Sequence, residues 1–240
     1  MKKIAMMMVC LIALGASAQT TVTRSYPVKQ GQQVALDFDF PKVVKVSTWD
    51  KNEVYVKATV SINDGENDSA FVLEDKSKDG VLSISNRIKD RESLPKRYTI
   101  MRDGQKLVFK TRGEMRAFGD KNGIRNYYSE GVDMDITLEI KVPAGMATDI
   151  KAKYGIVELV GFNGPVTVTA TYGGIDATVQ EANTGKLSAT TNYGQIYSNL
   201  DLKVKDYTEK NFYTSFTAEP GKGPAYILTS KYGKIYLRKP

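Results

Sequence analysis

The sequence has very few of the side chains that carry metal-binding and nucleophilic chemistry. Among its 240 residues there is one cysteine, Cys10, and no histidine. Without histidine, the usual base of Ser-His-Asp and Cys-His sites is missing, and so is the commonest zinc ligand. Cys10 lies in an apolar N-terminal run that we expect to be removed, so the mature chain has neither a disulfide nor a thiolate ligand. We therefore expect no cofactor, no metal and no enzyme of the familiar hydrolase classes.

Long hydrophobic runs are also scarce, and the one at the N-terminus is short. Met1-Lys2-Lys3 precedes an apolar run from Ile4 to Gly15, and Ala16-Ser17-Ala18 follows it. Charge, apolar core and small residues in this order predict a signal peptide over residues 1–18. The run is too short to cross a bilayer, which takes about 20 residues. We expect an exported protein, in the periplasm, at the cell surface or secreted.

Positive charge is concentrated in one segment. The formal net charge is +7, and residues 86–130 hold 12 Lys or Arg against six acids. We interpret residues 86–131 as a basic insertion, whose candidate contact residues for anionic glycan or another envelope component are Lys96, Arg97, Arg102 and Lys106. The alternative is a solvated excursion whose charges maintain solubility. Nucleic acid is not an expected partner, because the chain is exported and has no nucleic-acid-binding motif.

Strand patterns dominate the rest of the chain. Apolar and polar residues alternate from Val132 to Val142, which predicts a strand with one buried face. A hairpin is predicted from Tyr98 to Phe109 around Asp103-Gly104. No sustained helical period follows the signal peptide. We therefore predict an all-β protein with an N-terminal β region at 19–85, the insertion, and a repeat region at 132–240.

A Tyr-Gly repeat marks that last region. The tyrosines recur at steps of about 20 residues, the period of a solenoid. After each tyrosine the apolar alternation slips by one position, so we expect each Tyr-Gly step to turn the chain from one sheet into another, with glycine supplying a positive φ. This predicts a single-stranded parallel β-helix or solenoid, and the alternative is an antiparallel β-sandwich. The repeat residues are Tyr154, Gly155, Tyr172, Gly173, Tyr193, Gly194, Tyr232 and Gly233, with a glycine-free copy at Tyr213.

Two regular surfaces of the repeat are candidates for binding. The tyrosine rings are predicted to pack inward as a ladder, with exposed sugar-binding platforms as the alternative. Outward positions hold short polar side chains that form either a flat binding surface or an ordinary solvated face. The candidate contact residues on that face are Thr167, Thr169, Thr171 and Thr190.

Four aspartates carry the enzymatic alternative. Asp37 and Asp39, and likewise Asp133 and Asp135, stand two positions apart on the polar side of a strand. Such pairs occur in polysaccharide lyases and glycosidases and also bind calcium. The competing interpretation is that they keep exposed strands soluble.

Two stretches resemble the bacterial putative-adhesin family of β-strand-repeat proteins of unknown function, related to head-GIN-domain adhesin-like proteins. One is residues 43–56, which hold the pattern V-x-V-x-x-W-D-x-x-x-V-x-V, and the other is residues 138–145 with the Tyr-Gly repeats that follow. The resemblance implies an exported β-helical domain and brings no binding residues with it. We expect an adhesin-like interaction protein that binds a glycan, an envelope component or a protein. A polysaccharide-active enzyme and an envelope scaffold that self-associates through its solenoid ends are the alternatives.

Overall fold

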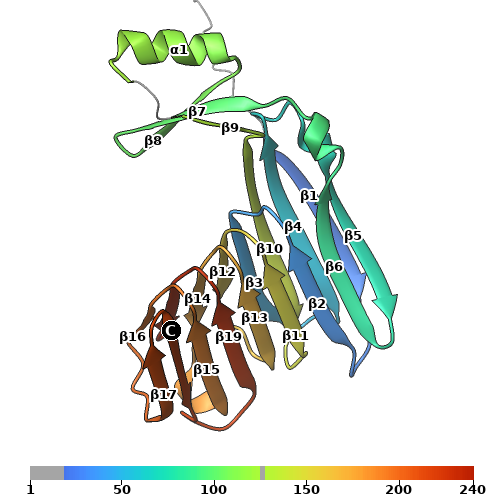
Figure 1. Cartoon of the computed structure of the whole chain (residues 1–240). Coiled ribbons are helices and arrows are strands. Elements are labelled where there is room, and N and C mark those ends of the chain that lie inside the picture. The colour runs from blue at the N-terminus through green and yellow to red at the C-terminus, as the bar shows by residue number, and fades with distance from the viewer. Residues whose placement is uncertain (1–18, 125–127) are drawn as a thin grey trace, which may run out of the picture.

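Two large β-sheets lie face to face in the computed structural model, which describes residues 19–124 and 128–240 (Figure 1). The predicted signal peptide lies outside the described residues. The first sheet runs in the order β1 (Thr20–Pro27), β4 (Glu53–Ile62), β10 (Met134–Pro143), β3 (Val43–Trp49), β12 (Ile156–Leu159), β14 (Ile175–Thr178), β20 (Ile235–Arg238) and β16 (Ile196–Ser198). The second runs β17 (Val204–Lys210), β18 (Tyr213–Ala218), β15 (Lys186–Thr191), β19 (Ala225–Ser230), β13 (Val166–Ala170), β11 (Thr148–Ala152), β2 (Gln33–Phe38), β6 (Val81–Ile88) and β5 (Phe71–Lys78).

A third, three-stranded sheet projects beyond one end and comes from the predicted insertion. It consists of β8 (Gln105–Phe109), β7 (Arg97–Arg102) and β9 (Ser129–Gly131). The predicted hairpin is confirmed, because Arg102 pairs with Gln105 across Asp103 and Gly104, which both have positive φ. The structure also has short 3₁₀ turns, η1 (Asp68–Ala70), η2 (Arg91–Ser93) and η3 (Glu181–Asn183).

The helix α1 (Arg112–Lys121) follows the hairpin, although the sequence shows no sustained helical period there. Its start is a capping box, in which Thr111 and Glu114 each accept a hydrogen bond from the other's backbone N–H. The T-x-x-E spacing is visible in the sequence, but the helix has only ten residues and a weak apolar stripe, so periodicity did not reveal it. Among the described residues no helix is long and apolar enough to cross a membrane.

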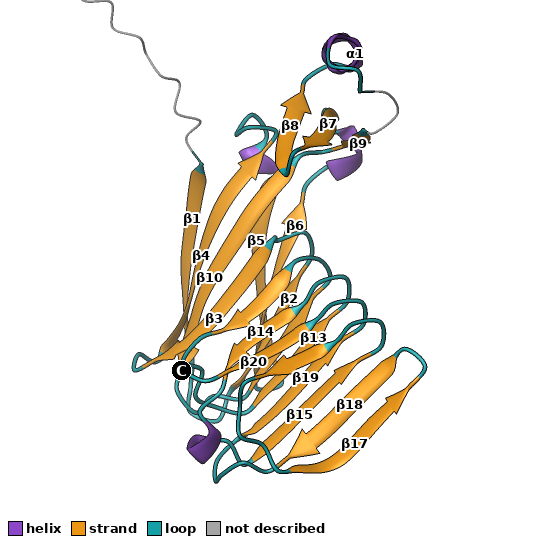
Figure 2. Cartoon of the chain, turned by 90° about the vertical axis from the view of Figure 1, so that its left-hand side faces the viewer, coloured by secondary structure: helices purple, strands orange, loops and turns teal. Residues whose placement is uncertain are grey.

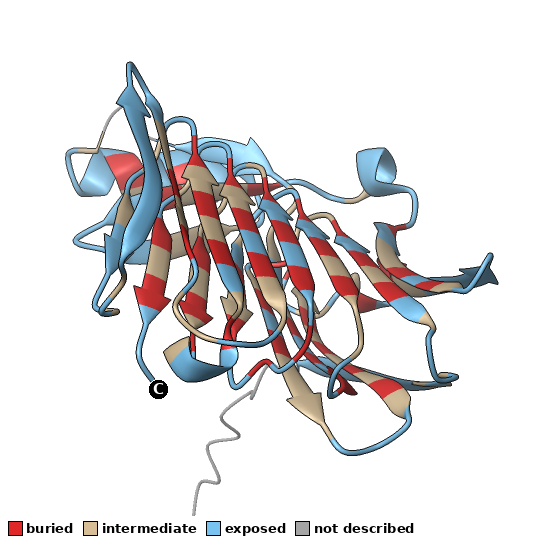
Figure 3. Ribbon diagram, turned by 90° about the horizontal axis from the view of Figure 1, so that it is seen from below, coloured by how far each residue is buried: buried red, intermediate tan, exposed pale blue. Residues whose placement is uncertain are grey.

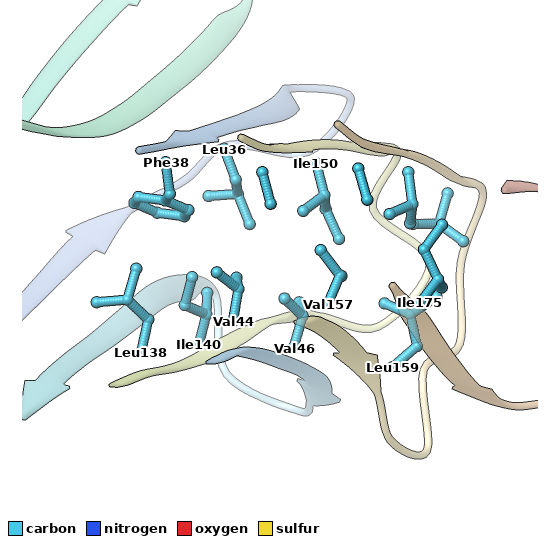
Figure 4. Packing of buried hydrophobic residues seen from close by; sticks show 14 of the residues in the cluster. Leu36, Phe38, Val44, Val46, Leu138, Ile140, Ile150, Val157, Leu159 and Ile175 are labelled. Atoms are coloured by element: carbon cyan, nitrogen blue, oxygen red, sulfur yellow. The ribbon is translucent and has the colours of Figure 1, made fainter. Parts of the chain in front are cut away.

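The core lies between the two large sheets. Leu36 and Phe38 of the second sheet face Leu138, Ile140 and Val44 of the first (Figure 4). Buried and exposed residues alternate along the strands, as Figure 3 shows by colour. Burying each such aliphatic or aromatic side chain contributes about 1.5–3 kcal/mol, which accounts for a stable fold without disulfides.

The all-β prediction is confirmed, and both large sheets are mixed. In the second sheet parallel pairs occupy the middle and antiparallel pairs, β5–β6, β15–β18 and β17–β18, stand at both ends. In the first sheet antiparallel pairs stand at the β1 end only, and parallel pairing runs from β10 to the β16 edge. Mixed sheets packed face to face fit the sandwich alternative better than the predicted parallel β-helix.

The copies of the repeat do not lie in the order of the sequence. The strand pair β19–β20, which ends the chain, lies between β13–β14 and β15–β16 in both sheets. The last copy is therefore internal, and the idea that it leaves an open end for self-association loses its basis. The Tyr213 copy is not a turn between sheets, because Tyr213 begins β18, which pairs antiparallel with both β15 and β17.

Candidate functional site

Each of the four Tyr-Gly steps connects a strand of the second sheet to a strand of the first. The steps join β11 to β12, β13 to β14, β15 to β16 and β19 to β20. The resulting turns lie one beside another along one side of the molecule (Figure 2). Hydrogen bonds continue through them, because Tyr172 N–H donates to Lys153 C=O at 2.9 Å and Tyr232 N–H donates to Thr171 C=O at 3.0 Å. The predicted passage between sheets at each step is thus present.

Glycine is required at these turns mainly by close backbone contact. A Cβ on Gly173 would lie 1.4 Å from the carbonyl oxygen of Gly155, and one on Gly233 would lie 2.0 Å from that of Gly173. Of the four repeat glycines, only Gly155 has positive φ, at 80°. The predicted conformational reason therefore holds for Gly155 alone, and the others stack too closely for a side chain.

Buried hydroxyl groups tie neighbouring turns together. Ser230 Oγ accepts a hydrogen bond from Gly233 N–H at 2.9 Å and donates one to Gly173 C=O at 2.9 Å. Thr191 Oγ1 accepts from the N–H of Gly194 at 3.1 Å and donates to Gly233 C=O at 3.0 Å. The same two contacts recur on adjacent rungs, so these side chains fix the spacing of the turns.

The tyrosines point outward, and the prediction of inward packing was wrong. Their exposed fractions are 40% for Tyr154, 56% for Tyr172, 58% for Tyr193 and 43% for Tyr232. Each preceding strand ends two residues before its tyrosine. The alternation that points side chains inward therefore stops before the tyrosine is reached, and the turn carries the ring to the surface.

Five exposed rings and the half-buried ring of Phe40 form one continuous stack, which we call the aromatic row. Neighbouring ring centroids are 5.2–5.6 Å apart, and the planes lie within 25° of parallel. This spacing follows the distance between strands of a sheet, about 4.8 Å. In spatial order the aromatic row consists of Phe40, Tyr154, Tyr172, Tyr232, Tyr193 and Phe212.

Both end members of the row come from outside the four Tyr-Gly copies. Phe40 occupies the turn between β2 and β3, two residues after the strand end, as the tyrosines do. Its backbone has φ 74°, a conformation that is rare and strained for a bulky side chain and costs about 1–3 kcal/mol. Phe212, in the turn between β17 and β18, is 72% exposed. Sequence reasoning missed both, since neither belongs to a Tyr-Gly pair.

Cationic side chains lie against the aromatic row. Lys153 Nζ is 5.8 Å from the Tyr154 ring centroid, and Lys231 Nζ is 5.2 Å from that of Tyr232. The Arg91 guanidinium covers the end ring, Phe40, at 5.1 Å. Such a distance allows cation–π attraction at the end ring, Phe40. The faces of Tyr154 and Tyr232 are occupied by their stacked neighbours, so Lys153 and Lys231 add positive charge beside these rings.

A groove of about 580 Å³ opens at the Phe40 end of the row. Phe40 and Tyr154 line one side, and residues of the small sheet, including Thr99 and Met101, line the other. Arg91 also lines it. The aromatic row and the predicted insertion therefore meet at one place on the surface.

The four predicted basic contact residues are engaged within the protein. Lys96 pairs with Glu130 at 3.2 Å, Arg102 donates to Asn122 Oδ1 at 2.9 Å, and Lys106 pairs with Asp133. Arg97 is buried, and its Nη2 donates to Glu66 at 2.5 Å, which removes it from the candidate surface. Hydrogen bonds from Lys110 and then Arg97 hold the pKa of Glu66 below its ordinary value. The contacts of Arg97, Lys106 and Lys110 fasten the small sheet to the body of the protein, whereas those of Lys96 and Arg102 lie within the insertion.

The predicted threonines lie on the outer face of the second sheet. Thr169 pairs in register with Thr229, and Thr229 with Thr190, so they form a flat polar surface together with exposed Thr167. Thr171 directly precedes Tyr172 and is the member of this set nearest the aromatic row. A shallow groove of about 460 Å³ includes Thr167.

The four candidate aspartates do not converge on one site. Asp37 lies on β2 of the second sheet, and Asp39 lies in the turn after that strand. Asp135 lies on β10 of the first sheet, and Asp133 lies just before β10. Asp39 faces Lys153 at 3.7 Å and Asp135 faces Lys42 at 3.4 Å. Within residues 19–124 and 128–240 no three potential metal ligands cluster.

The comparisons with known proteins give one informative likeness of fold. No family model matches the sequence, and no curated protein matches it. The crystal structure of a putative cell adhesion protein from Clostridium sporogenes ATCC 15579 superposes with a TM-score of 0.50 at 9% identity, covering 93% of this chain and 100% of that one. A putative adhesin from Bacteroides fragilis NCTC 9343 aligns at 12% identity over 92% and 98% of the two chains, with a TM-score of 0.25. At such identities the first likeness shows a shared fold.

Proposed function

We propose that the mature chain is an exported, non-enzymatic, adhesin-like binding protein of the bacterial envelope, and that the aromatic row is its contact surface. The N-terminal charge, apolar run and small residues support export. The fold shared with the Clostridium protein, described as a putative cell adhesion protein, supports the adhesin-like role. The periplasm and the outer surface both fit this proposal.

The observation that carries the proposal is a stack of five exposed aromatic rings and the half-buried ring of Phe40 on one side of the molecule. A contiguous apolar surface on a soluble domain usually marks an interaction site. The strained backbone at Phe40 strengthens this interpretation, because strain persists where the surrounding structure or function holds it in place. The row also continues into the groove at its Phe40 end, which could bind the terminus of an extended ligand.

Binding of the purified mature chain to an array of bacterial and host glycans tests the proposal. The variant Tyr172→Ser with Tyr232→Ser removes the two central rings, and we expect it to lose at least tenfold in affinity for any ligand found. The matched control is Tyr207→Ser, which removes a tyrosine that is 60% exposed on β17, outside the row. Unchanged binding by a folded double variant would remove the aromatic row as the contact surface.

A further inference from the structure

We propose that the aromatic row binds an extended acidic glycan through its ring edges and the lysines beside it. This inference rests on the proposed function and adds the chemical class of the ligand.

The stacking decides which part of each ring a ligand meets. Tyr172 lies between Tyr154 and Tyr232, with centroids 5.3 and 5.2 Å away and planes within 15° of parallel. Its two faces are therefore covered, and its exposed part is an edge and the hydroxyl group. Sugars that stack on aromatic faces find no open face in the middle of the row. The edge of an aromatic ring carries partial positive charge and the face partial negative charge. A row of edges therefore favours oxygen-rich and negatively charged groups.

The charged residues beside the four tyrosines in the sequence are lysines, and Asp39, directly before Phe40, adds a carboxylate at that end of the row. The residues directly before the four tyrosines are Lys153, Thr171, Asn192 and Lys231. The residues two positions after them are Ile156, Gly174, Gln195 and Lys234. Lys231 and Lys234 are exposed, and within the described residues neither forms an ion pair with a carboxylate. Lys153 shares its charge with Asp39 at 3.7 Å. Lys231 thus offers an unneutralised cation in the central part of the row, and Lys234, whose Nζ lies 5.7 Å from the Tyr197 ring centroid, offers another beside the row.

The spacing of these lysines suits a polymer. Lys153 and Lys231 precede tyrosines that are two rungs apart in the row, with Tyr172 between them. Two rungs of a sheet span about 10 Å. An extended pyranose chain advances by about one strand spacing per sugar, so a carboxylate on every second sugar would meet successive lysines. A glycan with an acidic disaccharide repeat therefore fits the row better than a compact anion.

Oligosaccharides of equal length from hyaluronan, alginate and polygalacturonate, each compared with its carboxyl-reduced form, test this inference by calorimetry on the mature chain. We expect at least one acidic member to bind tenfold or more tightly than its reduced form and to weaken as salt rises. Lys231→Gln with Lys234→Gln should remove most of that preference. The control is Lys186→Gln with Lys222→Gln, a pair of exposed lysines at the far ends of the strands, and it should retain the preference.

The outcomes separate this inference from the proposed function. If reduced and acidic forms bind equally and Tyr172→Ser with Tyr232→Ser still abolishes binding, the aromatic row is a binding surface and the acidic class is wrong. If no acidic member binds, the acidic class is also wrong, whatever the wider glycan array shows. If double-stranded DNA competes as well as the acidic glycan at equal charge, the row recognises charge alone and the inference fails.

Discussion

The rings of Tyr172 and Tyr232 lie 5.2 Å apart and within 3° of parallel, although β13 and β19, which precede them, are separated in sequence by β14 through β18. Stacked aromatic pairs contribute about 0.5–1.5 kcal/mol beyond the area that they bury. A double-mutant cycle with Tyr172→Ala and Tyr232→Ala should therefore show coupling of that size in urea unfolding. Additive single effects would mean that the stacking contributes nothing to stability.

Gly173→Ala should destabilise the protein by about 3 kcal/mol or more, because its Cβ would lie 1.4 Å from the Gly155 carbonyl oxygen and backbone must move. The matched control is Gly131→Ala in β9, where a Cβ meets nothing within 4 Å. The comparison of the two urea midpoints measures the effect. Equal midpoints would show that the turns do not stack as closely as described.

Ser230→Ala should cost about 1–3 kcal/mol, since it leaves Gly233 N–H and Gly173 C=O without their side-chain partner. Ser230→Thr should stay close to the parent, because Thr191 makes the same two hydrogen bonds one rung away. Thermal unfolding of the two variants side by side is the test. A loss of stability in both variants alike would point to packing, not to the hydroxyl.

Tyr226 should make the fold sensitive to alkali. Burial raises the pKa of its hydroxyl from 10.0 to about 12, and the hydroxyl donates to Phe162 C=O at 2.5 Å. Between those two pH values the unfolded chain releases this proton and the folded chain keeps it, so the stability present below pH 10 declines as pH rises towards 12. The full effect is roughly 2–3 kcal/mol.

The variant Tyr226→Phe isolates this titration. It should be less stable than the parent by about 1 kcal/mol at neutral pH, because the hydrogen bond is lost. Its unfolding free energy should then fall less steeply between pH 10 and 12, when measured by urea titration at several pH values. Parallel pH profiles for variant and parent would assign the alkaline loss to other tyrosines.

The sequence predicted local structure well where a strand stays in one sheet. The Val132–Val142 alternation corresponds to β10, and Asp103-Gly104 forms the expected hairpin turn. Period-two patterns and turn residues act over a few positions, so they are visible in the chain itself. The turn at each Tyr-Gly step was found for the same reason.

The order of the strands could not be predicted in this way. No local feature of the sequence shows whether β19 pairs with β13 or with β18, because all copies of the repeat have similar strand edges. The outward direction of Tyr154 and its equivalents was missed since the alternation was extended past the strand end at Ala152. Arg97 was assigned to the surface from its charge, and its partner Glu66 lies 31 positions away in the sequence.

The placement of β19–β20 between two earlier strand pairs has a consequence for the order in which the sheets can form during synthesis. The ribosome completes β13 to β16 before Ala225 has been made, yet these pairs do not bond to each other directly in the finished protein. A chain shortened by its last sixteen residues, from Ala225 to Pro240, would have a gap in both sheets and unpaired backbone groups on either side of it. The strands β19 and β20, made after β13 to β16, thus fill the gap between them, so neither sheet is continuous until these two strands have been synthesised.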